Sequence, residues 1–411
     1  MREMKDSGIA WIGKIPKEWG IVKFKYLHNG LNTGEAIDKE YWESDAGLNA
    51  FYTAGLTPIR TGYSNFPTWK ETGENDLLLA RNGTPYVYLP VSKAYYTDHI
   101  IRAAMSSLVN RRFIRYCLQQ SIASIAVDSV SIPTWSATLW NNQILTWPSV
   151  IEQERIAAFL DAECAEIDAV LEKTRASIEE YKKLKQAVIT QAVTKGIRGD
   201  RPMKNSGIEW IGDIPAEWEI KRIKNICSLK TGSTPSTGNA EWFNGDLLWF
   251  TPGDFNEKFA LISSNRTLSR TAEKDGVATM IPANSVLVVC IGGSAGKVGY
   301  TNYGCSCNQQ ITALCKSNIM PKLLMYDVNA GMPFLRNTTM FTTLPILNNQ
   351  AIGGLVLPIP REEEQLSIIE YLDEKCAGID ALIAKKQQYL TEIENYKKSL
   401  IYEYVTGKRE A

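Results

Sequence analysis

Two long stretches of the chain repeat apolar side chains every three, four or seven residues, which is the pattern of a helix that packs along a partner. They cover residues 149–196 and 361–411. The first seam runs through Ile156, Leu160, Ile167, Leu171, Thr174, Ile178, Tyr181, Lys185, Val188 and Ala192, and the second through Ile368, Leu372, Ile379, Ile383, Lys386, Leu390, Ile393, Lys397, Leu400 and Tyr404. We therefore predict two helices, each about 69 Å long at about 1.5 Å per residue.

The ends of these stretches carry helix boundary signals. Ser149 and Glu152 have the spacing of a capping box. Gly196 and Gly407 stand where a helix C-terminus favours glycine. One helix of that length with one apolar seam needs a partner, and the chain supplies an equivalent helix.

The regions before each helix, residues 20–148 and 219–360, show a different pattern. Short apolar runs that end in glycine predict buried strands that enter turns, and they are "NDLLLARNG" (75–83) and "NSVLVVCIGG" (284–293). At similar distances after them come "YYTDHIIRAAMS" (95–106) and "GCSCNQQITALC" (304–315). The stretch 111–126, "RRFIRYCLQQSIASIA", predicts a short amphipathic helix. We read both regions as mixed α/β bodies.

The chain is two copies of one unit. "MKDSGIAWIGKIPKEW" from Met4 returns as "MKNSGIEWIGDIPAEW" from Met203, with 12 of 16 positions identical at an offset of 199. The segments that start at Pro148 and Pro360 match without a gap at an offset of 212. Their matched pairs include Glu152/Glu364, Gln153/Gln365, Leu160/Leu372, Asp161/Asp373, Cys164/Cys376, Ile167/Ile379 and Asp168/Asp380. The bodies between these frames barely resemble each other, which favours one architectural task and two different recognition tasks.

The repeat predicts the architecture. The fold class is α+β: two mixed α/β globular domains in inverted orientation, joined by two long helices that pair antiparallel about a pseudo-two-fold axis. The alternative is that the helices pair between chains or pack only on their own bodies. We expect these boundaries: 1–148 opening motif and first body, 149–196 helix, 197–360 opening motif and second body, and 361–411 helix.

Each opening motif contains two tryptophans, Trp11 and Trp19 in the first and Trp210 and Trp218 in the second. Exposed aromatic residues could bind a partner subunit. Because they recur inside an architectural repeat, we expect each motif to pack beside the helices as a clasp. By symmetry, the first clasp should lie near the end of the second helix, which brings the chain termini together.

Composition is that of an ordinary globular protein, with 44% hydrophobic and 22% charged residues. The net charge is zero, but residues 219–360 carry 12 Lys+Arg against 8 Asp+Glu, and residues 20–150 carry 11 against 10. The helical segments 150–196 and 361–411 are net −2 and −3, so the bodies lean basic. We expect a cytoplasmic protein without a signal peptide, a membrane span or disulfides, its eight cysteines being buried thiols.

No catalytic constellation stands out. The glycine-rich stretch "IGGSAGKVG" (291–299) lacks the first glycine of a phosphate loop and has Val298 where Ser or Thr is needed. A tight turn between strands is the better interpretation. The chain has only two histidines, His28 and His99, far from the neighbouring Cys305 and Cys307, and no metal site is expected. A binding module fits better than an enzyme.

An opening "SGIEWIGDIPAEW", a variable body and a segment "P-x-x-x-E-Q-x-x-I-x-x-x-L-D", all of it present twice, resemble the specificity (S) subunit of type I restriction–modification systems. The resemblance covers nearly the whole chain. It implies that each body is a target recognition domain that reads one half of a split, asymmetric site in double-stranded DNA. It also implies that the paired helices set the spacer and dock two modification (methyltransferase) subunits.

The resemblance further implies that restriction (motor and nuclease) subunits join through the modification subunits. S-adenosylmethionine, ATP and Mg²⁺ would belong to those partners, with no cofactor and no catalysis in this chain. Two alternatives stay open: a coiled-coil scaffold that binds protein partners without reading DNA, and a self-contained restriction enzyme.

Base edges are read by Arg, Lys, Asn or Gln on exposed turns. By that criterion the candidate DNA-binding residues are Arg81, Asn82, Tyr86, His99 and Arg102 in the first body and Lys230, Lys297, Asn308, Gln309 and Gln310 in the second. Lys297 is the candidate for a phosphate contact. Arg60 and Arg266 are weaker candidates. Each of these side chains could instead only satisfy backbone groups.

Overall fold

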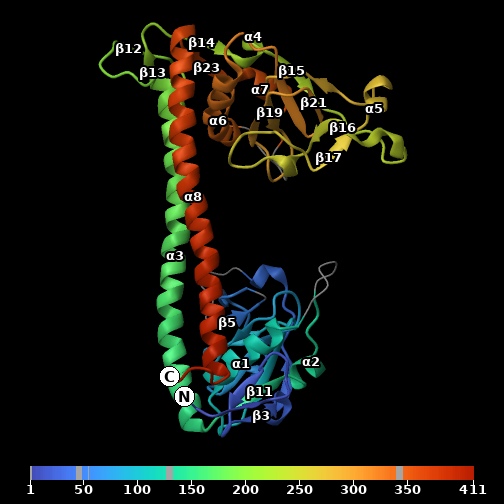
Figure 1. The fold of residues 1–411 in the computed structure, drawn as a ribbon, viewed down its shortest axis with the longest axis vertical. Coiled ribbons are helices and arrows are strands. Elements are labelled where there is room, and N and C mark those ends of the chain that lie inside the picture. The colour runs from blue at the N-terminus through green and yellow to red at the C-terminus, as the bar shows by residue number, and fades with distance from the viewer. Residues whose placement is uncertain (1, 43–48, 54, 126–132, 339–345) are drawn as a thin grey trace. The chain divides into compact units, whose positions relative to one another are not determined.

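The computed structural model describes residues 2–42, 49–53, 55–125, 133–338 and 346–411 (Figure 1). Its contacts divide the chain into two compact units. Unit 1 comprises Met1–Arg175 and Gln388–Ala411, and unit 2 comprises Ala176–Gln387. Each unit therefore contains one body together with a part of each long helix.

Both predicted long helices are present. They are α3 (Val150–Lys195) and α8 (Glu362–Val405). The Ser149 hydroxyl accepts from the amide of Glu152 at 3.3 Å, as the capping spacing predicts. Gly196 and Gly407 follow the helices with φ of 74° and 70°, a left-handed conformation that glycine adopts without strain.

The helices pair within the chain, and in each unit the paired segments run antiparallel. In unit 1, Asp168 of α3 accepts from Lys397 of α8, and the ring centroids of Phe159 and Tyr404 lie 4.4 Å apart. In unit 2, Lys185 of α3 donates to both carboxylate oxygens of Asp380 at 2.8 Å. The two ion pairs are the same contact displaced by the repeat, so the intramolecular pairing is confirmed.

The body of unit 1 contains a four-stranded antiparallel sheet of order β4-β10-β7-β8, a three-stranded sheet β6-β5-β9 and a two-stranded sheet β11-β3. The strands are β3 (Gly20–Lys23), β4 (His28–Thr33), β5 (Asn49–Tyr52), β6 (Ile59–Thr61), β7 (Asp76–Ala80), β8 (Val87–Tyr88), β9 (Tyr95–Tyr96), β10 (Ile100–Met105) and β11 (Ile144–Trp147). The helices are α1 (Arg111–Ala123) and α2 (Ala137–Asn141), with 3₁₀ turns at Phe24–Tyr26, Lys39–Tyr41 and Thr68–Lys70. Ala126, the last residue of the predicted amphipathic stretch, lies outside the described residues.

The body of unit 2 contains two four-stranded sheets, β15-β22-β19-β20 and β17-β16-β21-β18, and a two-stranded sheet β14-β23. The strands are β14 (Glu219–Arg222), β15 (Ser228–Thr231), β16 (Phe243–Phe250), β17 (Arg266–Leu268), β18 (Met280–Ile281), β19 (Ser285–Val289), β20 (Val298–Thr301), β21 (Cys305–Cys307), β22 (Ile311–Cys315) and β23 (Val356–Ile359). The helices are α4 (Ile223–Ile226), α5 (Arg270–Lys274), α6 (Pro321–Thr338) and α7 (Asn349–Gly354), with 3₁₀ turns at Ala240–Trp242 and Pro252–Asp254.

The two bodies share one topology although their sequences differ. The central sheets have the same order of strands along the chain, and in each body the second sheet contains a parallel pair, β5 with β9 and β16 with β21. The helix that follows the central sheet, α1 or α6, is succeeded by a short helix and a strand that pairs back to β3 or β14. The glycine-rich stretch 291–299 lies in the hairpin between β19 and β20, as predicted.

Both faces of each central sheet are buried. In unit 1, Leu77 and Leu79 belong to the core cluster that contains α1 and the long helices, whereas Leu78 packs with the tyrosines of the other face. In unit 2, Val286 and Val288 pack with α6, and Leu287 lies in the second cluster. This two-sided burial explains why the strands are continuous apolar runs rather than alternating ones.

The opening motifs pack beside the long helices, as predicted, and each contacts the start of one of them. They form the two-stranded sheets β1 (Met4–Asp6) with β2 (Lys14–Pro16) and β12 (Met203–Asn205) with β13 (Asp213–Pro215). The indole of Trp19 donates to Glu152 at 2.9 Å, and that of Trp218 donates to Glu364 at 2.8 Å. Each glutamate also pairs with an arginine, Arg2 in the first copy and Arg201 in the second.

The first clasp also contacts the end of α8. Lys408 donates to the carbonyl of Ile12 at 2.8 Å, and Arg2 lies 3.0 Å from the carboxylate of Glu410. The termini therefore lie together in unit 1 (Figure 1). All eight cysteines are buried thiols outside any disulfide, as expected. Among the described residues, no helix combines the length and the apolarity that a bilayer crossing requires.

Candidate nucleic-acid interface

In unit 1, three of the predicted residues gather where β7 ends and β10 begins. The amide of Arg81 donates to the carbonyl of His99 at 2.9 Å. The side-chain nitrogen of Asn82 lies 2.8 Å from Nδ1 of His99. Arg81 and His99 are exposed, and the Arg81 guanidinium reaches the carbonyl of Asp98 at 3.4 Å. This cluster offers a guanidinium, an amide and an imidazole to a ligand.

The other two predicted residues of this body face inward. Arg102 pairs with Asp76 at 2.9 Å and donates to the carbonyls of Trp69 and Glu71. Burial raises the pKa of Asp76, opposed by a bond from the Gly73 amide and by the charge of Arg102. The guanidinium is therefore bound within the domain, where it holds the turn that carries Trp69.

Tyr86 is half-buried, and its ring lies 5.9 Å from that of Tyr88. It packs beside the cluster of buried tyrosines on the far face of the sheet. Trp69 is 62% exposed, and the ammonium of Lys70 lies 4.9 Å from its ring. The sequence analysis did not include Trp69 among the candidate DNA-binding residues, although its position between two polar residues is a signal of an exposed tryptophan.

In unit 2, the three consecutive predicted residues form a turn before β22. The Asn308 amide group bonds to the side chain and to the backbone of Gln310, both at 3.1 Å. Gln309 between them is exposed. The turn therefore uses two of the amides to hold its own shape and presents the third.

The two lysines of the second body that were predicted to bind DNA are exposed and contact backbone carbonyls. Lys297 in the hairpin reaches the carbonyl of Phe255 at 3.4 Å, and Lys230 on β15 donates to that of Met280 at 2.8 Å. Arg266 lies over the rings of Trp249 and Phe243, at 4.8 and 5.4 Å from their centroids. Arg60 is exposed on β6.

The clusters of the two bodies occupy the same topological position. The bond from Arg81 to His99 has its counterpart in the bond from the amide of Cys290 to the carbonyl of Gln310, at 2.7 Å. Immediately beyond, Asn82 forms a β-bridge with Thr134 in unit 1. In unit 2 the corresponding bridge joins Ile291 and Ile346. One place in the fold therefore carries Arg, Asn and His in one body and Cys, Ile and Gln in the other.

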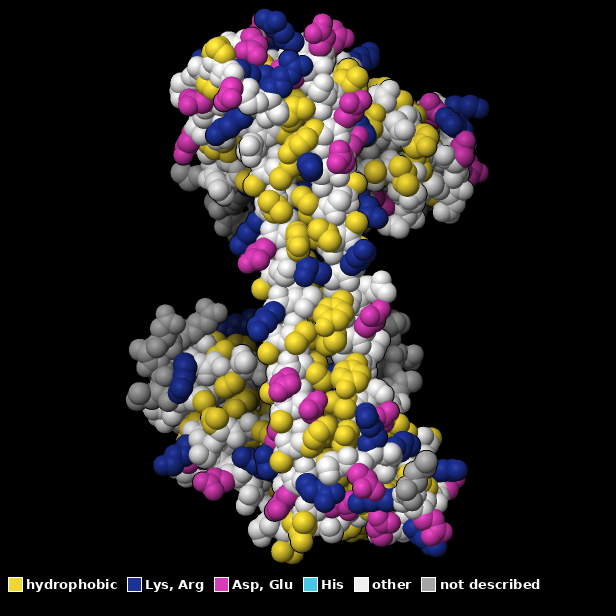
Figure 2. Space-filling model, turned by 60° about the vertical axis from the view of Figure 1, so that its left-hand side comes forward, with side chains coloured by type: hydrophobic (Ala, Val, Ile, Leu, Met, Phe, Trp, Pro, Cys, Tyr) yellow, Lys and Arg dark blue, Asp and Glu magenta, His cyan; other side chains and the backbone are white. Residues whose placement is uncertain are grey.

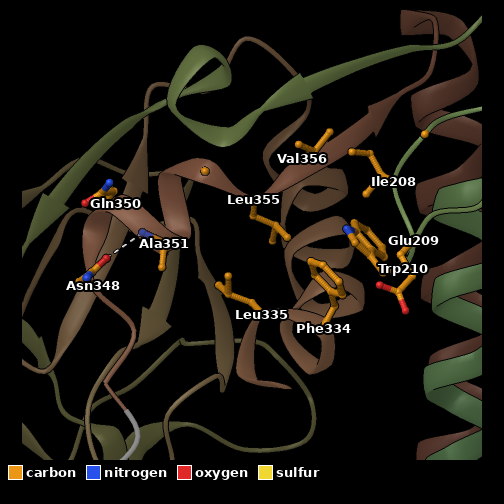
Figure 3. Close-up of a pocket in the computed structure, with 12 residues that line it drawn as sticks. Ile208, Glu209, Trp210, Phe334, Leu335, Asn348, Gln350, Ala351, Leu355 and Val356 are labelled. Atoms are coloured by element: carbon orange, nitrogen blue, oxygen red, sulfur yellow. Dashed lines mark hydrogen bonds between the residues drawn. The ribbon is translucent and has the colours of Figure 1, made fainter. Parts of the chain in front are cut away.

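A pocket of about 660 Å³ in unit 2 lies apart from these residues, between the second opening motif, α6 and α7 (Figure 3). Figure 3 shows the rings of Trp210 and Phe334 on one side and Leu355 opposite. The indole nitrogen of Trp210 is buried without an acceptor among the described residues. Its counterpart Trp11 donates to the carbonyl of Ile144 at 3.2 Å. The indole hydrogen bond of the first clasp therefore has no counterpart in the second clasp among the described residues.

The long helices present apolar side chains to solvent in both units, and Figure 2 shows hydrophobic side chains gathered over them. In unit 1, Val170 is 39% and Tyr396 is 50% exposed. Their counterparts in unit 2, Leu382 and Leu184, are 44% and 49% exposed. Because the repeat relates the two pairs, each unit exposes an equivalent apolar surface.

Comparisons with known proteins cover most of the chain. The sequence model of one family, described as the type I restriction modification DNA specificity domain, matches residues 215–394, which include the second body and most of α8. The type I restriction enzyme MjaVIII specificity subunit of Methanocaldococcus jannaschii is 23% identical over 96% of this chain and 94% of its own length. The MjaIX specificity subunit of the same organism is 28% identical over 40% of each chain.

A solved chain from a study of complex assembly and conformational transition of the type I R-M system shares the fold. It superimposes with a TM-score of 0.67 at 15% sequence identity, over 96% of this chain and 99% of that one. The resemblance noted from the repeated frame is therefore supported by sequence and by fold.

Proposed function

We propose, on the premise that this chain belongs to the specificity-subunit family of type I restriction–modification systems, that it selects the DNA sequence on which such a complex acts. The family match is to a DNA specificity domain, which disfavours a scaffold that binds only proteins. Methyl transfer, strand cleavage and translocation, with S-adenosylmethionine, ATP and Mg²⁺, belong in this proposal to partner subunits. The complex would work in the cytoplasm.

Each body reads one half of a bipartite target in this proposal. The observation that carries it is the shared topology with unlike residues at one position: Arg81, Asn82 and His99 in unit 1, and Cys290, Ile291 and Gln310 in unit 2, where Gln310 ends the turn 308–310. Arg pairs best with guanine, and Asn or Gln with adenine. Because the two clusters differ, the two half-sites differ. The basic balance of residues 219–360 supports phosphate contacts by Lys297 and Lys230.

In this proposal the paired helices join the two readers and dock the modification subunits. What supports this is the equivalent apolar surface of each unit, Val170 with Tyr396 and Leu184 with Leu382. Two equivalent surfaces suit two copies of one partner. Restriction subunits would join through the modification subunits.

Methylation mapping of DNA modified by the assembled complex tests the function. Asn82→Ala is expected to weaken modification and to relax the base preference in one half-site only, by about 10- to 100-fold at the affected position. Gln309→Ala is expected to do the same in the other half-site. Each variant removes one side-chain amide next to the end of a strand and leaves the backbone pairing of the sheets unchanged, and Asn82→Ala also removes the contact with His99.

Lys173→Ala is the matched control, because Lys173 is an exposed residue of α3 outside both bodies. It should leave both half-sites unchanged. A change in both half-sites from Asn82→Ala, or a wild-type complex that modifies DNA without a bipartite target, contradicts the proposal.

A further inference from the structure

Each body contacts its long helix through an aspartate at the same position of the repeat, although the bodies differ in sequence. In unit 1, the carboxylate of Asp161 on α3 accepts from the hydroxyl of Tyr116 at 2.8 Å and from Arg112 at 3.0 Å. In unit 2, that of Asp373 on α8 accepts from the hydroxyl of Tyr326 at 2.9 Å and from Lys322. In both units one oxygen binds the phenol and the other binds the basic group of the second helical residue. In unit 1 the oxygen that binds the phenol also accepts from Arg115 at 3.4 Å.

The donors occupy the same positions of their helices. Arg112 and Lys322 are the second residues of α1 and α6, and each tyrosine follows four residues later. That spacing places the base and the phenol on one face of the helix. Both tyrosines are buried, and burial raises the pKa of each phenol, which keeps it protonated as a donor.

A second contact recurs immediately before these helices. The side-chain oxygen of Gln153 accepts from the amide of Asn110 at 3.1 Å, and that of Gln365 accepts from the amide of Met320 at 2.9 Å. Each glutamine also donates to the proline carbonyl at the start of its own segment, at 3.1 Å. Both side chains are buried.

These contacts explain the repeated motif E-Q-x₇-D. Its glutamate binds the opening motif, its glutamine binds the backbone before α1 or α6, and its aspartate binds the first turns of that helix. We propose that Asp161 and Asp373 are positioning residues, which fix the angle at which each recognition domain stands on its helix.

Two bonds to one carboxylate from one helical face restrain rotation as well as distance. Packing of α1 against Ile156 and Leu160 is nondirectional, so it holds the body close without defining its angle. In a complex that reads two half-sites, a recognition domain with a variable angle on its helix would distinguish less well between targets with different spacer lengths. This step rests on the proposed function.

The DNA test measures binding by the assembled complex to duplexes that carry both half-sites at the native spacing or at spacings one and two base pairs longer or shorter. Asp161→Asn and Asp373→Asn are each expected to lose about tenfold in affinity at the native spacing, the effect of one weakened charge-assisted bond. They should lose less at the other spacings, so that the preference for the native spacer falls.

Glu166→Gln and Glu374→Gln are the controls, because they remove an exposed acid from the same helices. They should keep the wild-type preference. An equal loss at every spacing, or an unchanged preference, overturns the assignment. If Asp161→Asn does not assemble, Tyr116→Phe removes a single oxygen and is expected to shift the preference in the same direction by a smaller factor.

A readout without DNA separates this inference from the proposed function. Spin labels on Ser92→Cys in the first body and Lys173→Cys on α3 report the angle within unit 1, since the native cysteines are all buried. Asp161→Asn should broaden the distance distribution, and Glu166→Gln should not. A distance distribution of unchanged width in Asp161→Asn overturns the inference, even where DNA binding is intact. A broadened distribution supports it, even where the wild-type complex does not bind DNA.

Discussion

Asp327 of α6 is fully buried, and neither of its carboxylate oxygens has a hydrogen-bond partner among the described residues. Burial raises its pKa well above the ordinary value. The folded chain therefore holds a proton that the unfolded chain releases above about pH 4. The free energy of unfolding of unit 2 should fall as pH rises from there through the raised pKa.

Asp327→Leu tests this at the residue scale. It should stabilise unit 2 at pH 8 by about 1–3 kcal/mol, because a buried polar group without a partner is replaced by an apolar one. It should also flatten the dependence of stability on pH between pH 5 and 8. Chemical unfolding across that range, with amide hydrogen exchange of α6 to localise the effect, provides the measurement.

Cys117→Val is the matched control, because Cys117 is the counterpart of Asp327 on α1. Its thiol is fully buried 3.6 Å from the hydroxyl of Thr146, and burial raises its pKa to about 12. The control should leave the pH dependence as in the wild type. An Asp327→Leu protein with the wild-type slope would show that the carboxyl finds a partner.

Predicting the roles of single residues was limited because the sequence does not show which groups each side chain contacts in the fold. Arg81, Asn82 and His99 follow from strand ends, and the structure brings them together. Arg102 has the same residue type and lies nearby in sequence, but its guanidinium binds Asp76. Residue type and strand position could not distinguish these two arginines, because the difference lies in which carboxylate and carbonyls fold next to the side chain.

At the scale of elements, the two helix-pairing lysines have unequal surroundings. Lys185 is 7% exposed, and beyond its pair with Asp380 it donates to the carbonyl of Glu257 at 2.7 Å. Its ammonium also lies 4.7 Å from the ring of Phe259. The counterpart Lys397 is 25% exposed and pairs with an exposed Asp168. Lys185 thus ties a loop of the second body to the helices of unit 2.

Lys185→Met should therefore cost about 2–3 kcal/mol of stability, because it leaves a half-buried carboxylate and a carbonyl without their donor. Lys397→Met should cost less than about 1 kcal/mol, as expected for an exposed pair. Amide exchange should rise in the loop around Glu257 in the first variant alone. An equal loss of stability in the two variants would contradict the expectation that the buried Lys185 contributes more than the exposed Lys397.

The elements that local pattern determines were predictable. The periodic apolar seams predicted α3 and α8, with most of the helix ends correct to within about one residue. The continuous apolar runs predicted the buried strands β7 and β19. The shared topology of the bodies was not predictable, because strands buried on both faces accept any apolar sequence and the bodies barely align. The tyrosine and basic residue that bind Asp161 and Asp373 were missed for the same reason, since they belong to the divergent bodies.

At the scale of the whole molecule, the internal repeat relates the helix contacts of the two units. Asp168–Lys397 in unit 1 and Lys185–Asp380 in unit 2 are one contact displaced by the repeat, and the midpoints fall between residues 176 and 177 of α3 and between 388 and 389 of α8. We propose that the length of the helices about this midpoint determines how far apart the two half-sites lie.

The most direct measurement is methylation mapping in a strain whose specificity subunit carries four extra helix-forming residues after both Ala176 and Gln388. The insertions add about 6 Å to each helix, at about 1.5 Å per residue. The mapped target should keep both half-sites and gain about two base pairs of spacer, at about 3.4 Å per base pair. The same four residues inserted at the exposed turn of Gly276 should change nothing. A helix-insertion strain that methylates the parental spacing contradicts the account.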